Sequence, residues 1–315
     1  VGFAASSTSV QGGAISVSDE GAGSSDTYTL ASTTREILLL NGLTGAVTAA
    51  ADVTTFDADG FTLNWLTSNA TNLAAIHYVA LGGDDITNVS AGQFKVTPGT
   101  GASSTTGVGF RPDFLMFIGT GSTTQSQNVA NNFGTFSLGL AASSSQGPIE
   151  QAGWSLINRD GLATSDSCSR QSATSAIVIV GPNSVTCPAT DALASITSFD
   201  SDGFTFNKSD GPPASSTFFY LAIKGGDHQV GAFNAQTSAG NQSVGSVGAT
   251  PNLLFVTSFA SSSNGSAGVN ASMAIGAATS SAWGETIAYY SQDGDGTPDP
   301  DLRVSASSSA QRTFF

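Results

Sequence analysis

The sequence contains few charged residues. Asp, Glu, Lys and Arg make up only 10% of its 315 residues, whereas about a quarter is typical of soluble proteins. Nine residues are basic and 23 are acidic, so the formal net charge is −14. Nucleic acids and anionic membranes are bound through clustered Lys and Arg. Nine scattered basic residues therefore exclude both as partners.

Long apolar runs and good helix formers are also scarce. No apolar run approaches the ~18 residues that span a bilayer, and runs such as Ile37–Leu40 and Ile177–Val180 have the length of a strand. Gly occurs 37 times, and Ser and Thr are abundant. This composition favours short strands joined by turns over helices. Glu, a good helix former, occurs only at Glu20, Glu36, Glu150 and Glu285.

Signatures of catalysis are missing. The two histidines, His77 and His228, do not lie in a recognisable nucleophile motif. Glycosidases need a close pair of carboxylates, but the four Glu residues are isolated and the paired Asp residues fall in turn sequences. We therefore expect no enzymatic activity.

Only two cysteines are present, Cys168 and Cys187, and both lie in one part of the chain. A zinc site takes four Cys or His ligands, so two lone cysteines without clustered His do not form one. A disulfide that closes this loop and a pair of free thiols both fit the sequence.

Internal repeats are the most informative feature that is present. Five landmarks recur in the same order. They are FDADGFTLNW (56–65) and FDSDGFTFNK (199–208); IHYVALGGD (76–84) and FFYLAIKGGD (218–227); VGFRPDFLMF (108–117) and VGATPNLLFV (247–256); VGFAASS (1–7), LGLAASS (138–144) and IGAATSS (275–281); EILLLNG (36–42) and AIVIVGP (176–182).

The order of the landmarks predicts three units. Residues 1–85 are the C-terminal part of a first unit, residues 86–227 are a complete central unit, and residues 228–315 are the N-terminal part of a third. A unit without its last strands exposes sheet edges and an open core. We expect the natural polypeptide to extend beyond both ends. Donation of strands by a neighbouring subunit, which would build a fibre or a ring, is the alternative.

Each unit shows the patterns of a β-sandwich. Phe61, Leu63 and Trp65 alternate with polar residues, which is the period-two pattern of a half-buried strand. The segment IHYVAL (76–81) is apolar on both faces and predicts a strand that is covered on both sides. We therefore predict an all-β fold of tandem antiparallel β-sandwich units with very little helix.

The repeated decapeptide predicts a hairpin corner. Asp57, Asp59 and Gly60 form its turn, in which the Asp side chains cap backbone amides and Gly allows a positive φ. Phe56 and Phe61 are expected to anchor the two sides of the turn in the core. The central unit repeats these turn residues as Asp200, Asp202 and Gly203.

The complete set of landmarks resembles the concanavalin-like jelly-roll modules of tailed-phage virion proteins. The residues that carry the resemblance are Gly109 to Asp113, Gly153-Trp154, Phe199 to Phe204 and Tyr220 to Ala222. The third unit departs from the pattern, because Thr250-Pro251-Asn252 stands where the central unit has Arg-Pro-Asp. The resemblance implies a tail fibre, a head fibre or a capsid-decorating protein at the particle surface, and it implies no ligand.

One loop offers a candidate metal site. The stretch SQDGDGTPDPD (291–301) places several carboxylates at alternate positions in a flexible loop, as calcium prefers, but it lacks the downstream Glu of an EF-hand. A solvated acidic turn is the alternative. The carboxylates are Asp293, Asp295, Asp299 and Asp301.

The three tryptophans are candidates for stacking on sugar rings: Trp65, Trp154 and Trp283. Trp154 and Trp283 take similar positions in their units, and a recurring Trp in a β unit fits a core position as well.

We therefore expect a structural virion protein of a tailed bacteriophage that assembles through repeated β units. Its partners would be other copies of itself and other virion proteins. A carbohydrate-binding adhesin that recognises a host-surface glycan is the alternative, and a secreted glycoside hydrolase is a weaker one.

Overall fold

The protein is all-β. The computed structural model describes residues 1–6, 11–18, 23–68, 74, 76–121, 133–143, 147–181, 190–248, 250–258, 267–268, 270–280, 283–297 and 300–307. Every strand pairing in these ranges is antiparallel, and none of these residues is helical. No helix here is long and apolar enough to cross a membrane. The predicted fold class, antiparallel β-sandwich with little helix, is confirmed at this level.

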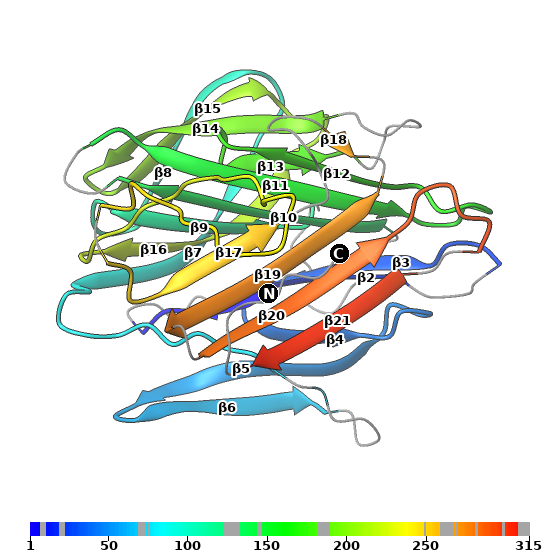
Figure 1. The fold of residues 1–315 in the computed structure, drawn as a ribbon, viewed down its shortest axis with the longest axis horizontal. Coiled ribbons are helices and arrows are strands. Elements are labelled where there is room, and N and C mark those ends of the chain that lie inside the picture. Colours follow the sequence, from blue (N-terminus) through cyan, green and yellow to red (C-terminus); the bar gives the residue numbers. More distant parts are fainter. Residues whose placement is uncertain are drawn as a thin grey trace.

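The central unit contains two sheets (Figure 1). The strands of the larger sheet are β7 (Asn88–Val96), β9 (Phe114–Gly119), β10 (Phe133–Ala142), β11 (Glu150–Arg159), β12 (Ser167–Ser172) and β16 (Ser216–Lys224). Their order is β12-β11-β10-β9-β16-β7. The strands of the smaller sheet are β8 (Gly101–Thr106), β13 (Ile177–Val180), β14 (Thr190–Asp200) and β15 (Gly203–Asp210). Their order is β13-β14-β15-β8.

A cluster of aromatic rings fills the space between these two sheets. We call this buried cluster the inner core. Phe94 on β7 is at its centre. Its ring centroid lies 5.3 to 5.8 Å from the centroids of four other Phe rings. Because β9 and β16 of the larger sheet and β15 of the smaller sheet all contribute, this one ring joins both layers. The four rings are those of Phe117, Phe204, Phe206 and Phe218.

The larger sheet is covered on both faces. Along β16, Phe218 and Tyr220 point into the inner core, whereas Phe219 and Leu221 point to the opposite face. The residues buried on that opposite face form a second cluster, which we call the outer core. It combines residues of all three units, including Phe3, Leu138 and Ala271. The continuous apolar sequence of β16 follows from this double burial.

The first and third units supply the cover of the outer core. The first unit has two three-stranded sheets, and the third has one four-stranded sheet in the order β17-β19-β20-β21. The strands of the first unit are β1 (Gly2–Ala4), β2 (Gln11–Ser18), β3 (Thr27–Ser32), β4 (Ile37–Leu40), β5 (Val47–Asp57) and β6 (Gly60–Thr67). Those of the third are β17 (Leu254–Ser258), β18 (Ala267–Gly268), β19 (Ala271–Ser280), β20 (Trp283–Ser291) and β21 (Pro300–Ser307). The short β18 pairs with β12 and so extends the larger sheet of the central unit.

Strand registers repeat between the units. The β5–β6 and β14–β15 pairs have register shifts at the same places, and in each the Phe just before the turn pairs with the Phe just after it. In the third unit Val256 pairs with Gly276, as Phe117 pairs with Gly139 in the central unit. The sequence repeat is therefore also a repeat of backbone pairing.

Two glycines explain how the layers of one unit approach each other. A Cβ on Gly139 or on Gly153 would overlap the carbonyl group of Ala176, just before β13. In the first unit a Cβ on Gly2 would overlap the carbonyl of Glu36, just before β4. Glycine at this place lets a backbone carbonyl of the second sheet pack directly on the first.

The hairpin corner uses hydroxyl groups where capping of amides was expected. Asp200 accepts hydrogen bonds from Ser198 Oγ and Thr205 Oγ1, both at 2.7 Å. Asp57 accepts equivalent bonds from Thr55 and Thr62. The first Asp therefore ties the two strands together through side chains, and the expectation of amide capping was wrong for it.

The second Asp of the corner behaves as expected only in the central unit. Asp202 accepts hydrogen bonds from the amides of Gly107 and Gly109, after β8, and these bonds lower its pKa. Gly203 has a φ of 145°, and a Cβ there would overlap the carbonyl of Thr105 on β8. No strand equivalent to β8 lies beside Asp59 in the described part of the first unit.

Two expectations for the first unit were wrong. Residues 76–82 form no strand, although their counterpart in the central unit is β16, and Tyr78 is 68% exposed. Phe56 is 52% exposed, whereas its counterpart Phe199 is 8% exposed. In the central unit β16 pairs with β7 and β9. The described residues give segment 76–82 no such paired neighbours, so Phe56 and Tyr78 stay largely exposed.

Glu36 makes the stability of the first unit depend on pH. The pKa of Glu36 is raised from 4.5 to about 7, chiefly by burial and also by the charge of Asp52, while backbone amides of Glu36 and Val53 act in the opposite direction. The folded form therefore holds a proton that the unfolded chain loses above its lower pKa. We predict that the unfolding free energy falls as pH rises from 4.5 to 7, and that Glu36→Gln removes this loss.

Chemical denaturation of both proteins at several pH values measures the effect. The advantage of Glu36→Gln over the parent should grow between pH 4.5 and 7 and stay constant above that window. Parallel stability curves would show that Glu36 is not protonated by folding.

Candidate assembly surfaces

A serine of the first unit is inserted into a turn of the central unit. Ser25 exchanges backbone hydrogen bonds with this turn: Ser25 N donates to Leu162 O at 2.8 Å, and Gly161 N donates to Ser25 O at 2.7 Å. The hydroxyl of Ser25 donates to Arg159 O and accepts from Leu162 N. Thr27 N also donates to Asp160 Oδ1 at 2.9 Å.

The same contact joins the central unit to the third. Ser165 N donates to Asp295 O, and Gly294 N donates to Ser165 O, both at 2.8 Å. The hydroxyl of Ser165 donates to Gln292 O and accepts from Asp295 N. Ser167 N donates to Asp293 Oδ1 at 2.9 Å. All five bonds therefore have a counterpart in the first contact.

We call this arrangement the serine junction. It is polar and directional, because the serine always comes from the earlier unit and the Asp-Gly turn from the later one. Ser25 and Ser165 are 3% and 5% exposed, so their hydroxyl groups are largely removed from water and the loss of a bond to one of them is costly. Units that dock in one direction form a head-to-tail series.

The serine junction changes the interpretation of the acidic loop. The carboxylate of Asp293 accepts the Ser167 amide, and that of Asp295 accepts the Thr297 amide. Asp299 and the side chain of Asp301 lie outside the described residues. Among the residues that the structure describes, no three His, Cys, Asp or Glu side chains are grouped as metal ligands. Calcium binding by the four Asp residues stays a prediction.

Sequence reasoning missed the serine junction, although its signal was present. Ser-Asp occurs at 25–26 and at 165–166, and Asp-Gly occurs at 160–161 and at 293–294. From the sequence, the loop at 291–301 was considered only as a candidate ion site. A comparison of each unit with the next would have matched the serine of one with the turn of the other.

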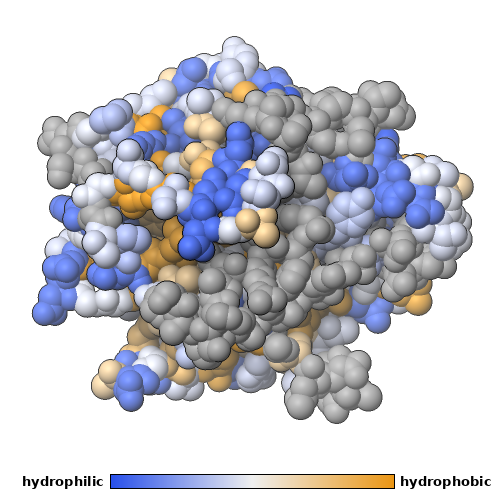
Figure 2. All heavy atoms as spheres, viewed as in Figure 1, coloured by the Kyte–Doolittle hydropathy of each residue, from blue (hydrophilic) through white to orange (hydrophobic). Residues whose placement is uncertain are grey.

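A second candidate surface is the open side of the first unit, which we call the open face. It consists of β5, β6 and the segment 76–81. Phe56, Trp65 and Tyr78 are all exposed there. Figure 2 shows hydrophobic residues at the surface along the edge of the molecule where β5 and β6 lie. Apolar surface of this kind marks an interaction site.

The open face keeps part of the packing of the central unit. The rings of Phe61 and Tyr78 meet edge to face at 5.3 Å. Their counterparts Phe204 and Tyr220 meet in the same way at 5.7 Å. The segment 76–81 therefore lies over β6 as β16 lies over β15, but without hydrogen-bonded neighbours in the described structure.

The tryptophans do not share one environment. Trp154 is 2% exposed in the outer core, so its ring is not accessible to a sugar. Trp65 lies on the same side of β6 as Phe61 and Leu63, and is exposed as part of the open face. On paired strands Trp154 lies opposite Leu138. Trp283 lies opposite Ser280 and not opposite Ile275, which is the counterpart of Leu138 in the third unit. The expected equivalence of Trp154 and Trp283 was therefore wrong.

The remaining sequence candidates have structural contacts. His77 Nδ1 lies 2.5 Å from Glu285 Oε2, which links the open face to β20. His228 Nε2 donates to Gly225 O at 2.8 Å. Cys168 is buried and disulfide-bonded, whereas Cys187 lies outside the described residues.

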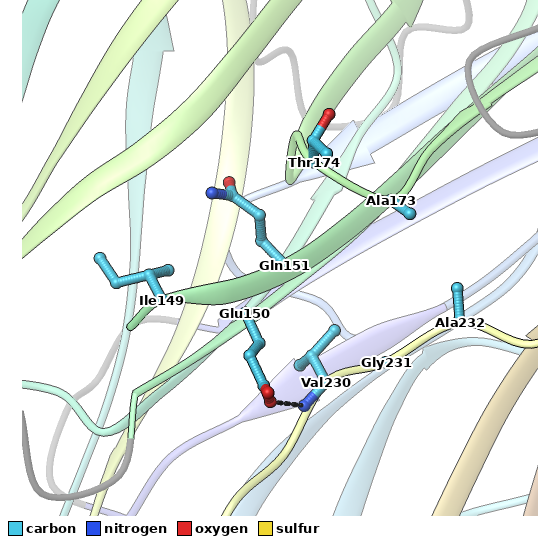
Figure 3. A pocket seen from close by; sticks show the side chains of 8 residues that line it. All are labelled: Ile149, Glu150, Gln151, Ala173, Thr174, Val230, Gly231 and Ala232. Carbon is cyan, nitrogen blue, oxygen red and sulfur yellow. Dashed lines mark hydrogen bonds between the residues drawn. The ribbon is translucent and has the colours of Figure 1, made fainter. Parts of the chain in front are cut away.

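A small pocket lies where the chain leaves the central unit. Its volume is about 330 Å³. The carboxylate of Glu150 accepts the amide of Val230 at 3.3 Å, and Figure 3 shows this bond at the pocket wall. The same carboxylate accepts a hydrogen bond from Gln229. Glu150 therefore serves to hold the start of the third unit against β11.

We predict that Ser165→Ala loosens the junction between the central and third units. The change removes the bond to Gln292 O and leaves the part-buried Asp295 amide without this partner, which costs about 1–3 kcal/mol. Hydrogen exchange should then be faster at the amides of Gly294 and Asp295. Ser25→Ala should act in the same way on Gly161 and Leu162.

Ser24→Ala, at an exposed neighbouring serine, is the matched control and should leave exchange unchanged. Equal exchange in Ser165→Ala and the parent would contradict a role of the hydroxyl in holding the two units together.

No family model matches the chain, and neither the curated proteins nor the solved structures contain a significant match to it.

Proposed function

We propose that this protein is a structural component of a tailed-phage particle, a fibre or a surface decoration, and that it works by assembling with other copies of itself. The observation that carries the proposal is the serine junction, which occurs twice with the same five hydrogen bonds. A junction repeated between successive units serves to build an extended object from one kind of part.

The open face supports the same function. A soluble monomer rarely exposes a contiguous apolar surface without a partner, and here the exposed residues are those that the central unit buries. The low content of charged residues fits such a role, because a Ser-, Thr- and Gly-rich surface offers little for ionic adsorption. The resemblance to concanavalin-like jelly-roll modules of virion proteins supplies the phage context and the jelly-roll connectivity in this proposal.

Binding of a host glycan gains no comparable support. Trp154 is buried, and Trp65 is exposed as part of the apolar open face. Assembly accounts for the exposure of Trp65 without a sugar ligand.

The proposal predicts self-association of the purified chain. Sedimentation velocity over a range of protein concentrations should show species larger than the monomer, and electron microscopy should show regular particles or filaments. The chain should also be a stoichiometric component of purified particles of a phage that encodes it, as measured by mass spectrometry. A chain that stays monomeric at every concentration and is absent from such particles contradicts the proposal.

A further inference from the structure

We propose that residues 228–248 of one copy dock on the open face of a second copy and add two strands there, next to β6 and segment 76–81, where the described residues place none. This inference rests on the proposed function, because it names the partner and the contact of self-assembly. In the central unit the counterparts of segment 76–81 and β6 are β16 and β15, and their edges are paired with β7 and β8. The covering element must therefore resemble the β7–β8 hairpin.

The third unit carries that hairpin as a sequence. Gly231-Ala232-Phe233 corresponds to Gly92-Gln93-Phe94, and the same number of residues separates each Phe from a following Val-Gly pair. In the structure residues 231–248 form no strand and are exposed throughout. Phe233 is 55% exposed, whereas Phe94 is the centre of the inner core. Like the open face, this segment therefore exposes an apolar residue whose counterpart in the central unit is buried between two sheets.

One pair of residues fits in detail. A Cβ on Gly92 would overlap the ring of Tyr220, its cross-strand partner, so this position must be glycine. The open face keeps the tyrosine as Tyr78, and the third unit keeps the glycine as Gly231. No atom lies within 4 Å of a Cβ placed on Gly231, so its own molecule gives no packing reason for glycine there.

The phenylalanine fits the same register. In the central unit Phe94 contacts Phe204, Phe206 and Phe218. The counterparts on the open face are Phe61, Leu63 and Ile76, which are all apolar. Docking of the segment would bring Phe233 onto these three residues and bury its ring. Backbone pairing with residues 76–81 adds a strand to the free edge, and the side chains fix the register.

A second copy is the partner that the contacts favour. Within one molecule the two pieces are held at different places: Gln229 and Val230 by Glu150, and His77 by Glu285. Residues 229–248 contain no Asp, Glu, Lys or Arg. The segment therefore adds no like charge when it approaches a chain of net charge −14. Because the donor and acceptor surfaces differ, repeated docking produces a chain of copies or a ring.

Cysteine cross-linking between two differently marked copies tests the inference. In the central unit Thr205 Oγ1 and Ser104 Oγ are 2.8 Å apart on paired strands. Their counterparts are Thr62 on the open face and Ser243 in the segment. We expect a mixture of Thr62→Cys and Ser243→Cys chains to form a disulfide-linked dimer on a non-reducing gel, and we expect neither variant alone to form it.

Two controls separate this contact from a random encounter. Thr237→Cys, in the same exposed segment at the turn position of Pro98, should give little dimer with Thr62→Cys. Gly231→Ala added to the Ser243→Cys chain should lower the yield about tenfold, because the methyl group overlaps Tyr78. Gly245→Ala should leave the yield unchanged. The counterpart of Gly245 is Thr106, which carries a side chain, and no atom lies within 4 Å of a Cβ placed on Gly245.

The possible outcomes separate this inference from the proposed function. Absence of the mixed dimer in a chain that still self-associates overturns the pairing and leaves assembly by another surface. A cross-link that forms only inside a Thr62→Cys/Ser243→Cys monomer overturns the assignment to a second copy. A chain that neither cross-links nor self-associates contradicts both proposals.

Discussion

The architecture of the central unit depends on the packing of the Phe94 ring against four other Phe rings. The Phe94 ring meets rings from both layers of the sandwich, and the strand that carries it closes one edge of the larger sheet. Where the described structure provides an equivalent of this strand, apolar residues are buried. Where it does not, the same residue types are exposed, as Phe56 and Tyr78 show. One missing layer thus accounts for the open face.

Two kinds of contact therefore organise this molecule. The serine junction is polar and holds successive units of one chain in a fixed direction. The outer core is apolar and buries residues of all three units against one sheet. Polar contacts of fixed geometry give register and direction, whereas apolar burial provides most of the stabilisation. Together they explain how the first and third units pack on the central one.

Much of the fold could be predicted from the sequence. The repeated decapeptide identified β5–β6 and β14–β15, and their registers agree down to the position of the shifts. The sequence pattern of residues 76–81 could not show that they form no strand, since a strand needs neighbouring strands as well as an alternating apolar pattern. Phe56 was misjudged for the same reason, because burial depends on a layer that the segment itself does not encode.

The candidate sites were less accessible to sequence reasoning. The acidic loop was recognised by its carboxylates, but the partner of Asp293 is an amide of another unit, which a scan along one loop cannot reveal. The serine of the junction was overlooked because Ser is abundant throughout the chain. Its role depends on the approach of two units, and only the repeated geometry distinguishes Ser25 and Ser165 from the others.

The most direct measurement of the central claim is hydrogen exchange of the amides in residues 76–81 and 231–235 as a function of protein concentration. If a second copy completes the open unit, both segments should become protected together as concentration rises, because their strands form in one event. Rapid exchange in both segments at every concentration, under conditions where the chain is assembled, would contradict the account.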